Sequence, residues 1–111
     1  MKRQNSIGNL DLITMSMLIR LDDQAYGVSI SREIRQSVGY EVAFGTIYAV
    51  LERLERNGMV SSKLGESTPE RGGRAKRYFR ITAKGLSEVN RLRRAFIKLW
   101  QGVPELVEGK A

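Results

Sequence analysis

The chain has no cysteine and no histidine among its 111 residues. Without cysteine it can form no disulfide framework and has no thiolate to serve as a nucleophile or metal ligand. Without histidine it lacks the commonest general base and the commonest metal ligand of proteins. Its carboxylates stand singly on predicted helix faces, and no nucleophile, base and oxyanion donor cluster together. We therefore expect a protein that is not an enzyme and that holds no metal and no cofactor.

Long hydrophobic runs are also missing. The longest apolar stretch, Leu12–Leu21, is interrupted by Thr14, Ser16 and Arg20 and is too short to span a bilayer. The basic start, Met1–Arg3, runs into polar residues rather than an apolar core, so no signal peptide is expected. A chain of this length predicts one domain with a modest core, and a soluble cytoplasmic protein without a membrane partner is the default.

Acidic residues are scarce in one stretch. Residues 71–98 contain ten lysines and arginines and a single acid, Glu88, so this stretch carries a net charge of +9. Protein surfaces usually mix both signs, and a basic block on a folded segment favours a polyanion, most often nucleic acid. A membrane surface is the weaker alternative, because the densest charge has no bulky apolar face beside it.

The segment Phe44–Val60 predicts one amphipathic helix that the rest of the chain supports. Its apolar side chains share one face at helical spacing: Ile47, Val50, Leu51 and Leu54. Asn57-Gly58 is a signal for the end of this helix. The outer face carries small groups and hydroxyls near the helix N-terminus, which favours phosphate, although an ordinary core helix with a solvated outer face is equally consistent with this segment alone. The outer-face residues expected to contact DNA are Gly45, Thr46, Tyr48, Ala49 and Arg53.

Two further helices are predicted before it, over Gly8–Leu21 and Val28–Val38, with an extended link at Ala25–Gly27. A short turn at Glu41–Ala43 leads from the second helix to the third. A helix, a short turn and a helix with a small-residue outer face form a helix-turn-helix. We expect Thr46, Tyr48 and Ala49 to read bases.

After the third helix the apolar period changes from 3.6 to 2, which predicts strands over Val60–Leu64 and Lys76–Ile81. The eleven residues between them are rich in turn formers, so the strands form a hairpin with a long basic tip. Cations so close together repel one another, and Gly72-Gly73 permits a close backbone approach, so contact with DNA is favoured over a solvated loop. The cations expected at DNA are Arg71, Arg74, Lys76 and Arg77, and they should mainly add affinity.

Thr82 predicts the start of a last helix, which Gly102 and Pro104 should end near Gln101. Its apolar residues recur every three or four positions, as in a heptad seam. The domain is too small to bury the whole seam, so a homodimer is expected, and a fully intramolecular core is the alternative. The expected dimer interface comprises Val89, Leu92, Phe96, Leu99, Trp100 and Val103.

Two aromatic residues of this seam, Phe96 and Trp100, are also expected to border an apolar gap between the paired helices. Such a gap could admit a small, flat aromatic effector, because apolar concavities are where small ligands bind. The competing interpretation is a tryptophan simply packed in the dimer core.

Together these elements predict a mainly α (α+β) fold, a winged helix-turn-helix with a C-terminal dimerisation helix. The predicted organisation is an N-terminal arm at residues 1–9, a winged-helix DNA-binding domain at 10–82, and a dimerisation helix with a short tail at 83–111.

The chain resembles the PadR family of bacterial transcriptional regulators. The resemblance rests on Y-G-V-S-I at Tyr26–Ile30, G-T-I-Y-A-V-L-E-R-L-E-R-N-G-M-V at Gly45–Val60, and G-G-R-A-K-R-Y-F-R-I-T-A-K-G at Gly72–Gly85. It implies a repressor that binds double-stranded DNA as a dimer, and many members release DNA when a small effector binds. Tyr26, which opens the first motif, is therefore counted among the DNA-contacting residues. Ala49 departs from the pattern, since many members have proline there, and the chain resembles the short members that lack a large effector domain.

Two other classes of function compete with this interpretation. A winged helix that docks an acidic protein partner would carry the same positive charge, but it would bind duplexes without sequence preference. An enzyme is the poorer alternative, because the sequence contains no recognisable catalytic cluster.

Overall fold

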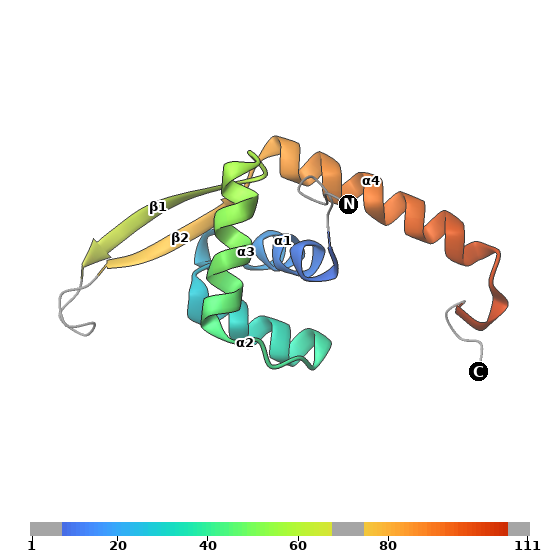
Figure 1. The fold of residues 1–111 in the computed structure, drawn as a ribbon, viewed down its shortest axis with the longest axis horizontal. Helices are drawn as coiled ribbons and strands as arrows, with labels where there is room; N and C mark the ends of the chain where they lie inside the picture. Colours follow the sequence, from blue (N-terminus) through green and yellow to red (C-terminus); the bar gives the residue numbers. More distant parts are fainter. Residues whose placement is uncertain (1–7, 68–74, 107–111) are drawn as a thin grey trace.

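The computed structural model describes residues 8–67 and 75–106, which form a helical body, a two-stranded wing and a long final helix (Figure 1). The elements in chain order are α1 (Asn9–Leu21), the 3₁₀ turn η1 (Asp22–Gln24), α2 (Gly27–Val38), α3 (Phe44–Arg56), β1 (Val60–Ser67), β2 (Ala75–Ile81), α4 (Ala83–Gln101) and the 3₁₀ turn η3 (Pro104–Leu106). The wing extends to one side of the body and α4 to the other (Figure 1). The predicted mainly α winged helix-turn-helix is confirmed.

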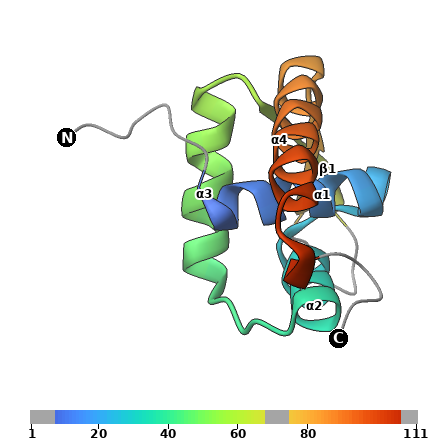
Figure 2. The ribbon, with the colours of Figure 1, turned by 90° about the vertical axis from the view of Figure 1, so that its right-hand side faces the viewer.

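The core lies among the first three helices, with α1 at its centre. α1 packs against α2, α3 and the first part of α4 (Figures 1 and 2). The large apolar side chains that are fully buried there are Met15, Leu18, Ile30, Ile34, Ile47, Leu51 and Leu54. The predicted inner face of α3 is confirmed, because all four of its apolar residues are buried. Burial of this face turns the opposite face of α3 outward.

The end of α3 is fixed by glycine. The Gly58 N–H donates to the Glu55 carbonyl at 3.0 Å, and the Met59 N–H donates to the Leu54 carbonyl at 2.9 Å. This pair of hydrogen bonds is the Schellman pattern, which requires a left-handed residue, and Gly58 has φ of 79°. The predicted stop at Asn57-Gly58 is confirmed.

The wing is longer than predicted. β1 continues to Ser67, beyond the predicted end at Leu64, with a register shift between these two residues. Gly65 is covered by the ring of Tyr78, since a Cβ at Gly65 would lie 2.7 Å from the Tyr78 Cε1 atom. Packing of an aromatic ring on the glycine therefore overrides the local preference for a turn.

Gly85 allows the first turn of α4 to lie directly against the backbone that follows α3. A Cβ at this position would lie 2.2 Å from the carbonyl oxygen of Met59, which cannot rotate away as a side chain could. The Gly85 N–H also donates to the Oγ1 atom of Thr82 at 3.1 Å, so the predicted cap is confirmed. A glycine is needed here for close packing.

We therefore expect Gly85→Ala to lower the free energy of unfolding by about 1–3 kcal/mol, because the added methyl must displace backbone. Urea denaturation of the two proteins measures this difference. Gly45→Ala is a matched control in α3, where an added Cβ would meet nothing within 4 Å. The control should leave stability unchanged or raise it by up to about 1 kcal/mol. An equal loss in both variants would contradict this packing argument.

The second half of α4 leaves the helical body. The whole of α4 has 19 residues and is about 28 Å long. Its buried residues are only Gly85 and Val89, and both lie near its start. The helix ends at Gln101 with Gly102 as its C-cap, as predicted. Among the described residues, none of the helices combines the length and apolar character needed to cross a bilayer.

Candidate nucleic-acid interface

The first two turns of α3 present an open outer face. Gly45, Thr46, Tyr48 and Ala49 are all exposed, as the sequence predicted. No atom lies within 4 Å of the position of a Cβ at Gly45, so a large partner can come close to the helix backbone there. The fold therefore brings four of the predicted site residues together on one surface.

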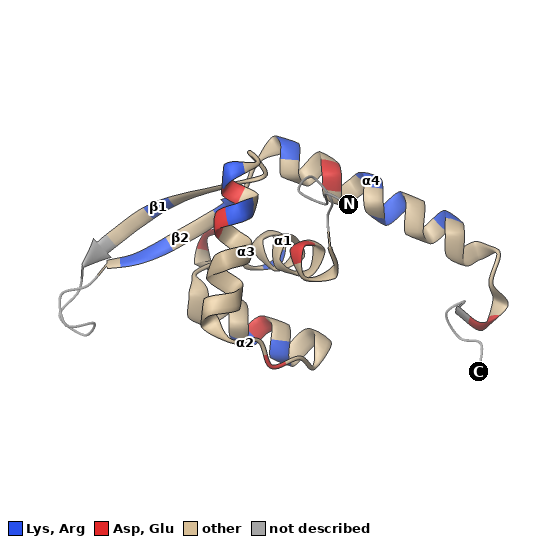
Figure 3. Cartoon of the chain, in the orientation of Figure 1, with Lys and Arg blue, Asp and Glu red and all other residues tan. Residues whose placement is uncertain are grey.

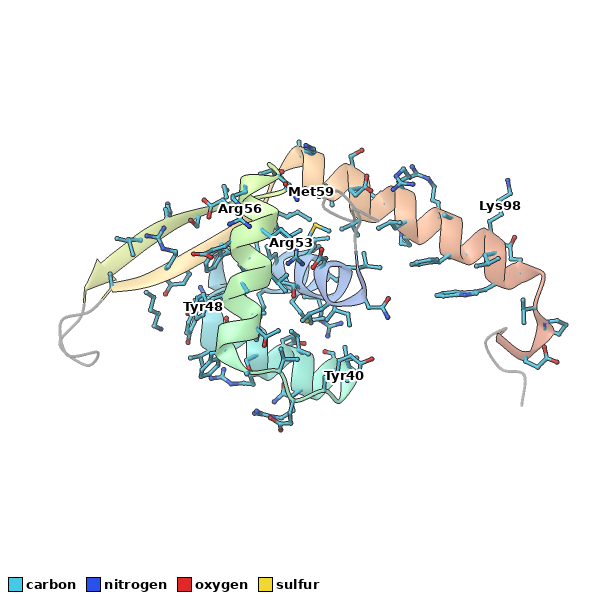
Figure 4. All side chains as sticks on the ribbon, viewed as in Figure 1. Tyr40, Tyr48, Arg53, Arg56, Met59 and Lys98 are labelled. Carbon is cyan, nitrogen blue, oxygen red and sulfur yellow. The ribbon has the colours of Figure 1, made fainter. Side chains whose placement is uncertain are left out.

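Tyr48 joins this face to the start of α2 and to the wing. It lies on the wing side of α3 (Figure 4), with its ring centroid 6.3 Å from that of Phe79 in β2. Its hydroxyl packs against Gly27, where a Cβ would lie only 2.2 Å from the hydroxyl oxygen. Tyr48 as a whole remains 42 % exposed, and its hydroxyl lies beside the N-terminus of α2.

The N-terminus of α2 lies beside that hydroxyl, with Gly27 and Ser29 buried and Val28 exposed. The helix begins at Gly27, one residue earlier than predicted, because the Tyr26 N–H donates to the Ser29 hydroxyl at 2.9 Å and fixes the entry of the chain. The first intrahelical bond runs from the Ile30 N–H to the Tyr26 carbonyl at 2.8 Å. The amides before Ile30 have no partner within the helix, and such a helix end favours an anion.

The base of the wing lies beside the same helix end. The Phe79 N–H donates to the Ala25 carbonyl at 2.9 Å and ties β2 to the segment before α2. The Lys76 Nζ atom lies 4.1 Å from the centroid of the Tyr26 ring, and this ring meets Tyr78 edge-on at 5.5 Å. The fold therefore brings the predicted residues Tyr26 and Lys76 to the start of α2, with Tyr48 adjoining it as well.

Two predicted DNA-contacting arginines also hold the fold together. Arg53 lies on the α1 side of α3 (Figure 4) and donates to the carboxylate of Asp11, which is buried. Arg77 donates to the Ser62 hydroxyl at 3.1 Å, and that hydroxyl donates to the carboxylate of Glu55 at 2.9 Å. Arg53 is therefore tied to α1 and Arg77 to the wing–α3 contact.

The other two predicted wing cations, Arg71 and Arg74, lie outside the described residues. The described part of the basic block is divided by the fold, because Lys76, Arg77 and Arg80 lie on β2 and the cations from Lys84 onward lie on α4 (Figure 3). Along the sequence the positive charge forms one continuous block, whereas the structure distributes its described part over two separate elements.

The predicted dimer residues follow one side of α4. Val89 is buried within its own chain, and Leu92 and Phe96 are half-buried. Leu99 and Trp100 are 63 % and 43 % exposed. Val103, which follows the helix, is half-buried. The Phe96 and Trp100 rings stack with centroids 5.4 Å apart and an interplanar angle of 14°.

Comparison with known proteins agrees with this geometry. Residues 17–91 match the model of the transcriptional regulator PadR-like family. The chain belongs to this PadR-like family. The PadR-like chain is 33 % identical over 78 residues to a transcriptional regulator of Mycobacterium tuberculosis, covering 70 % of this chain and 68 % of that one. The family that the sequence predicted is confirmed.

Solved structures share the fold of this PadR-like chain. A transcriptional regulator from Clostridium thermocellum is 30 % identical, with 89 % of this chain and 90 % of that chain covered and a TM-score of 0.70. Bacillus subtilis PadR in complex with operator DNA is 18 % identical, with 75 % and 46 % covered and a TM-score of 0.64. The similarity to Bacillus subtilis PadR shows a shared fold only.

Proposed function

We propose that this PadR-like protein is a sequence-specific DNA-binding regulator that acts in the cytoplasm as a homodimer on an inverted repeat and represses transcription. The observation that carries this proposal is the open outer face of α3 beside the N-terminus of α2, with the Tyr48 hydroxyl between them. Bacillus subtilis PadR, which has a similar fold, was solved in complex with operator DNA, and this supports DNA as the partner. A dimer bound across a promoter represses by occupying it.

The first two turns of α3 enter the major groove. Gly45 adds no side chain, so the helix backbone can come close to the edges of the bases. The Thr46 hydroxyl donates to or accepts from a base edge, and the Ala49 methyl packs on a thymine methyl group. These contacts read the sequence.

The surrounding groups hold the phosphate backbone and set the position of α3 in the groove. The amides at the start of α2 and the Tyr48 hydroxyl donate to one phosphate group. Lys76 and the other wing cations contact phosphates that flank it. Tyr48, which the sequence assigned to base reading, is therefore proposed as a phosphate contact, because its hydroxyl is directed to Gly27.

Paired substitutions test this division of roles. Thr46→Ala should cost about 1–3 kcal/mol on the preferred duplex and relax the preference at one base position. Lys76→Ala should weaken binding to all sequences alike and reduce the salt slope by about one unit. Fluorescence anisotropy titrations of a selected duplex and a random-sequence duplex give both quantities. A changed base preference in Lys76→Ala, with an unchanged one in Thr46→Ala, would reverse the assignment.

The competing function, a module that docks an acidic protein, makes a different prediction in the same titrations. Such a module binds duplex DNA through charge alone, so the selected and random-sequence duplexes would bind with equal affinity. A sequence-specific regulator binds the selected duplex at least about a thousandfold more tightly than the random one.

We further propose that a small, flat aromatic effector enters beside the Phe96–Trp100 stack and changes the spacing of the two recognition helices. The support is the stacked pair itself, in which Trp100 stays 43 % exposed. Trp100 is the only tryptophan, so its emission reports on this place alone. Planar aromatic compounds should quench the emission saturably and weaken operator binding. A saturable change in emission at constant DNA affinity would contradict the regulatory role.

A further inference from the structure

Half of the basic block lies on α4, away from the wing. Its α4 cations are Lys84, Arg91, Arg93, Arg94 and Lys98. Four of them share one side of the helix, because Lys84, Arg91, Arg94 and Lys98 are separated by seven, three and four residues. We call these four residues the α4 basic stripe.

The stripe is polar throughout and only partly neutralised. Glu88 is held by Arg91, whose Nε atom donates to it at 3.2 Å, and this hydrogen bond lowers the pKa of the Glu88 carboxyl. Lys84 donates to the Asn57 carbonyl at 2.8 Å. Within the described residues, neither Arg94 nor Lys98 forms an ion pair. The uncompensated charge therefore lies in the second half of α4.

From Arg91 onward, this side of α4 is opposite to the side that carries the apolar seam, whereas Lys84 at its start still contacts the end of α3. Val89 and Phe96, which mark the seam, are separated from the stripe by roughly half a turn of helix. A partner chain that covers the seam therefore leaves the stripe in solvent. Lys84 and Lys98 are 14 positions apart, so the stripe is about 21 Å long.

The second half of the stripe lies far from the outer face of α3 that is proposed to bind DNA. The molecule is 53 Å long, and the second half of α4 lies at the opposite end from the wing (Figure 3). Lys98 projects from the side of α4 that faces away from α2, whereas Tyr48 lies on the wing side of α3 (Figure 4). A straight duplex against Tyr48 and the wing cannot also contact Lys98 of the same protomer.

We propose that the α4 basic stripe binds the sugar-phosphate backbone of a second double-stranded DNA segment, so that one regulator bridges two duplexes. This inference rests on the proposed DNA-binding function. Its support is charge complementarity along a straight rod that presents cations and one hydroxyl, Ser87, without a large apolar side chain. Protein interfaces and membrane surfaces both need apolar anchors, which this side lacks. Phosphate contacts of this kind are independent of base sequence.

A two-duplex capture assay tests the proposal. The full-length protein is loaded on an immobilised duplex that was selected in vitro for tight binding. This duplex occupies the outer face of α3 in both protomers of a dimer. A fluorescent random-sequence duplex is then added, and both retained protein and captured fluorescence are measured. Wild-type protein should capture the second duplex. Arg94→Gln/Lys98→Gln should capture at least about tenfold less, because two phosphate contacts per protomer are lost.

Matched variants separate the stripe from total charge. Arg32→Gln/Arg35→Gln removes the same charge from the exposed side of α2 and should capture the second duplex within about twofold of wild type. Arg91→Gln should cost less than Arg94→Gln, because Arg91 is already paired with Glu88. All variants should be retained on the immobilised duplex within about twofold of wild type, since α3 and the wing are unchanged.

Three results would overturn the proposal while leaving DNA binding intact. These are wild-type retention without capture, capture by the stripe variant equal to wild type, and capture of phosphatidylserine vesicles in place of the duplex. If the stripe variant lost the immobilised duplex as well, the stripe would contact the operator itself and the bridging role would be wrong. Failure of wild type to be retained at all would instead overturn the proposed function.

Discussion

Phe96→Asp should convert the protein to a monomer and abolish tight binding to an inverted repeat. Phe96 lies where α4 has left the body, it is only half-buried in its own chain, and its ring stacks on the exposed Trp100. Burying these rings against a second α4 would remove a large apolar surface from water. Phe96→Ala alone should cost about 3–5 kcal/mol of dimer stability if the ring is fully enclosed. A buried carboxylate should cost more, because it lacks a partner.

The loss of DNA binding should follow from the loss of the dimer. Once one protomer of a dimer has bound its half-site, the other protomer meets the second half-site at an effective concentration in the millimolar range. A monomer loses this advantage. Analytical ultracentrifugation and anisotropy titrations measure the two effects on the same samples. Ser87→Asp places the same charge on the exposed polar side of α4 and should leave both unchanged. A Phe96→Asp variant that stays dimeric would place the interface elsewhere, and thermal unfolding shows whether the monomer is folded.

Salt should weaken DNA binding steeply. If a dimer neutralises about six to ten phosphates, the logarithm of affinity should fall with the logarithm of salt concentration at a slope of about −5 to −9. Between 50 and 200 mM salt this amounts to a loss of about 10³ to 10⁵ in affinity. The cause is the release of counterions condensed on the duplex, which each lysine or arginine displaces as it meets a phosphate.

The wing should contribute to that slope, whereas the base-reading face of α3 should not. Lys76→Ala should lower its magnitude by about one unit per contacted phosphate, whereas Thr46→Ala should leave the slope unchanged. Titrations of one duplex at four or more salt concentrations measure the slope for each variant. A slope near zero in the wild-type protein would contradict a phosphate-based interface.

Much of this architecture could be predicted from local patterns. The inner face of α3 follows from the spacing of its apolar residues, and its end follows from Asn57-Gly58, because only a glycine enters the left-handed conformation there without cost. The wing follows from the change of period after Gly58. The open face of α3 follows from the small residues Gly45 and Ala49.

Contacts between distant positions could not be predicted in this way. Asp11 and Arg53 are 42 residues apart, and only the packing of α1 on α3 brings them together. The extension of β1 past Gly65 depends on the ring of Tyr78, which arrives from the other strand. Likewise, charge counted along the chain does not reveal that Arg80 on β2 and Arg94 on α4 belong to elements that extend to opposite sides of the body (Figure 1), because the direction of α4 depends on packing such as that at Gly85.

The most direct test of the central proposal is a base-resolution hydroxyl-radical footprint of the protein on a duplex selected in vitro. A homodimer that reads DNA with two copies of α3 predicts two protected half-sites related by a two-fold axis, with centres about 10–21 base pairs apart. Thr46→Ala should reduce the protection of both half-sites to the same extent. A single protected tract, or two tracts arranged as a direct repeat, would contradict the proposal that a symmetric dimer reads an inverted repeat.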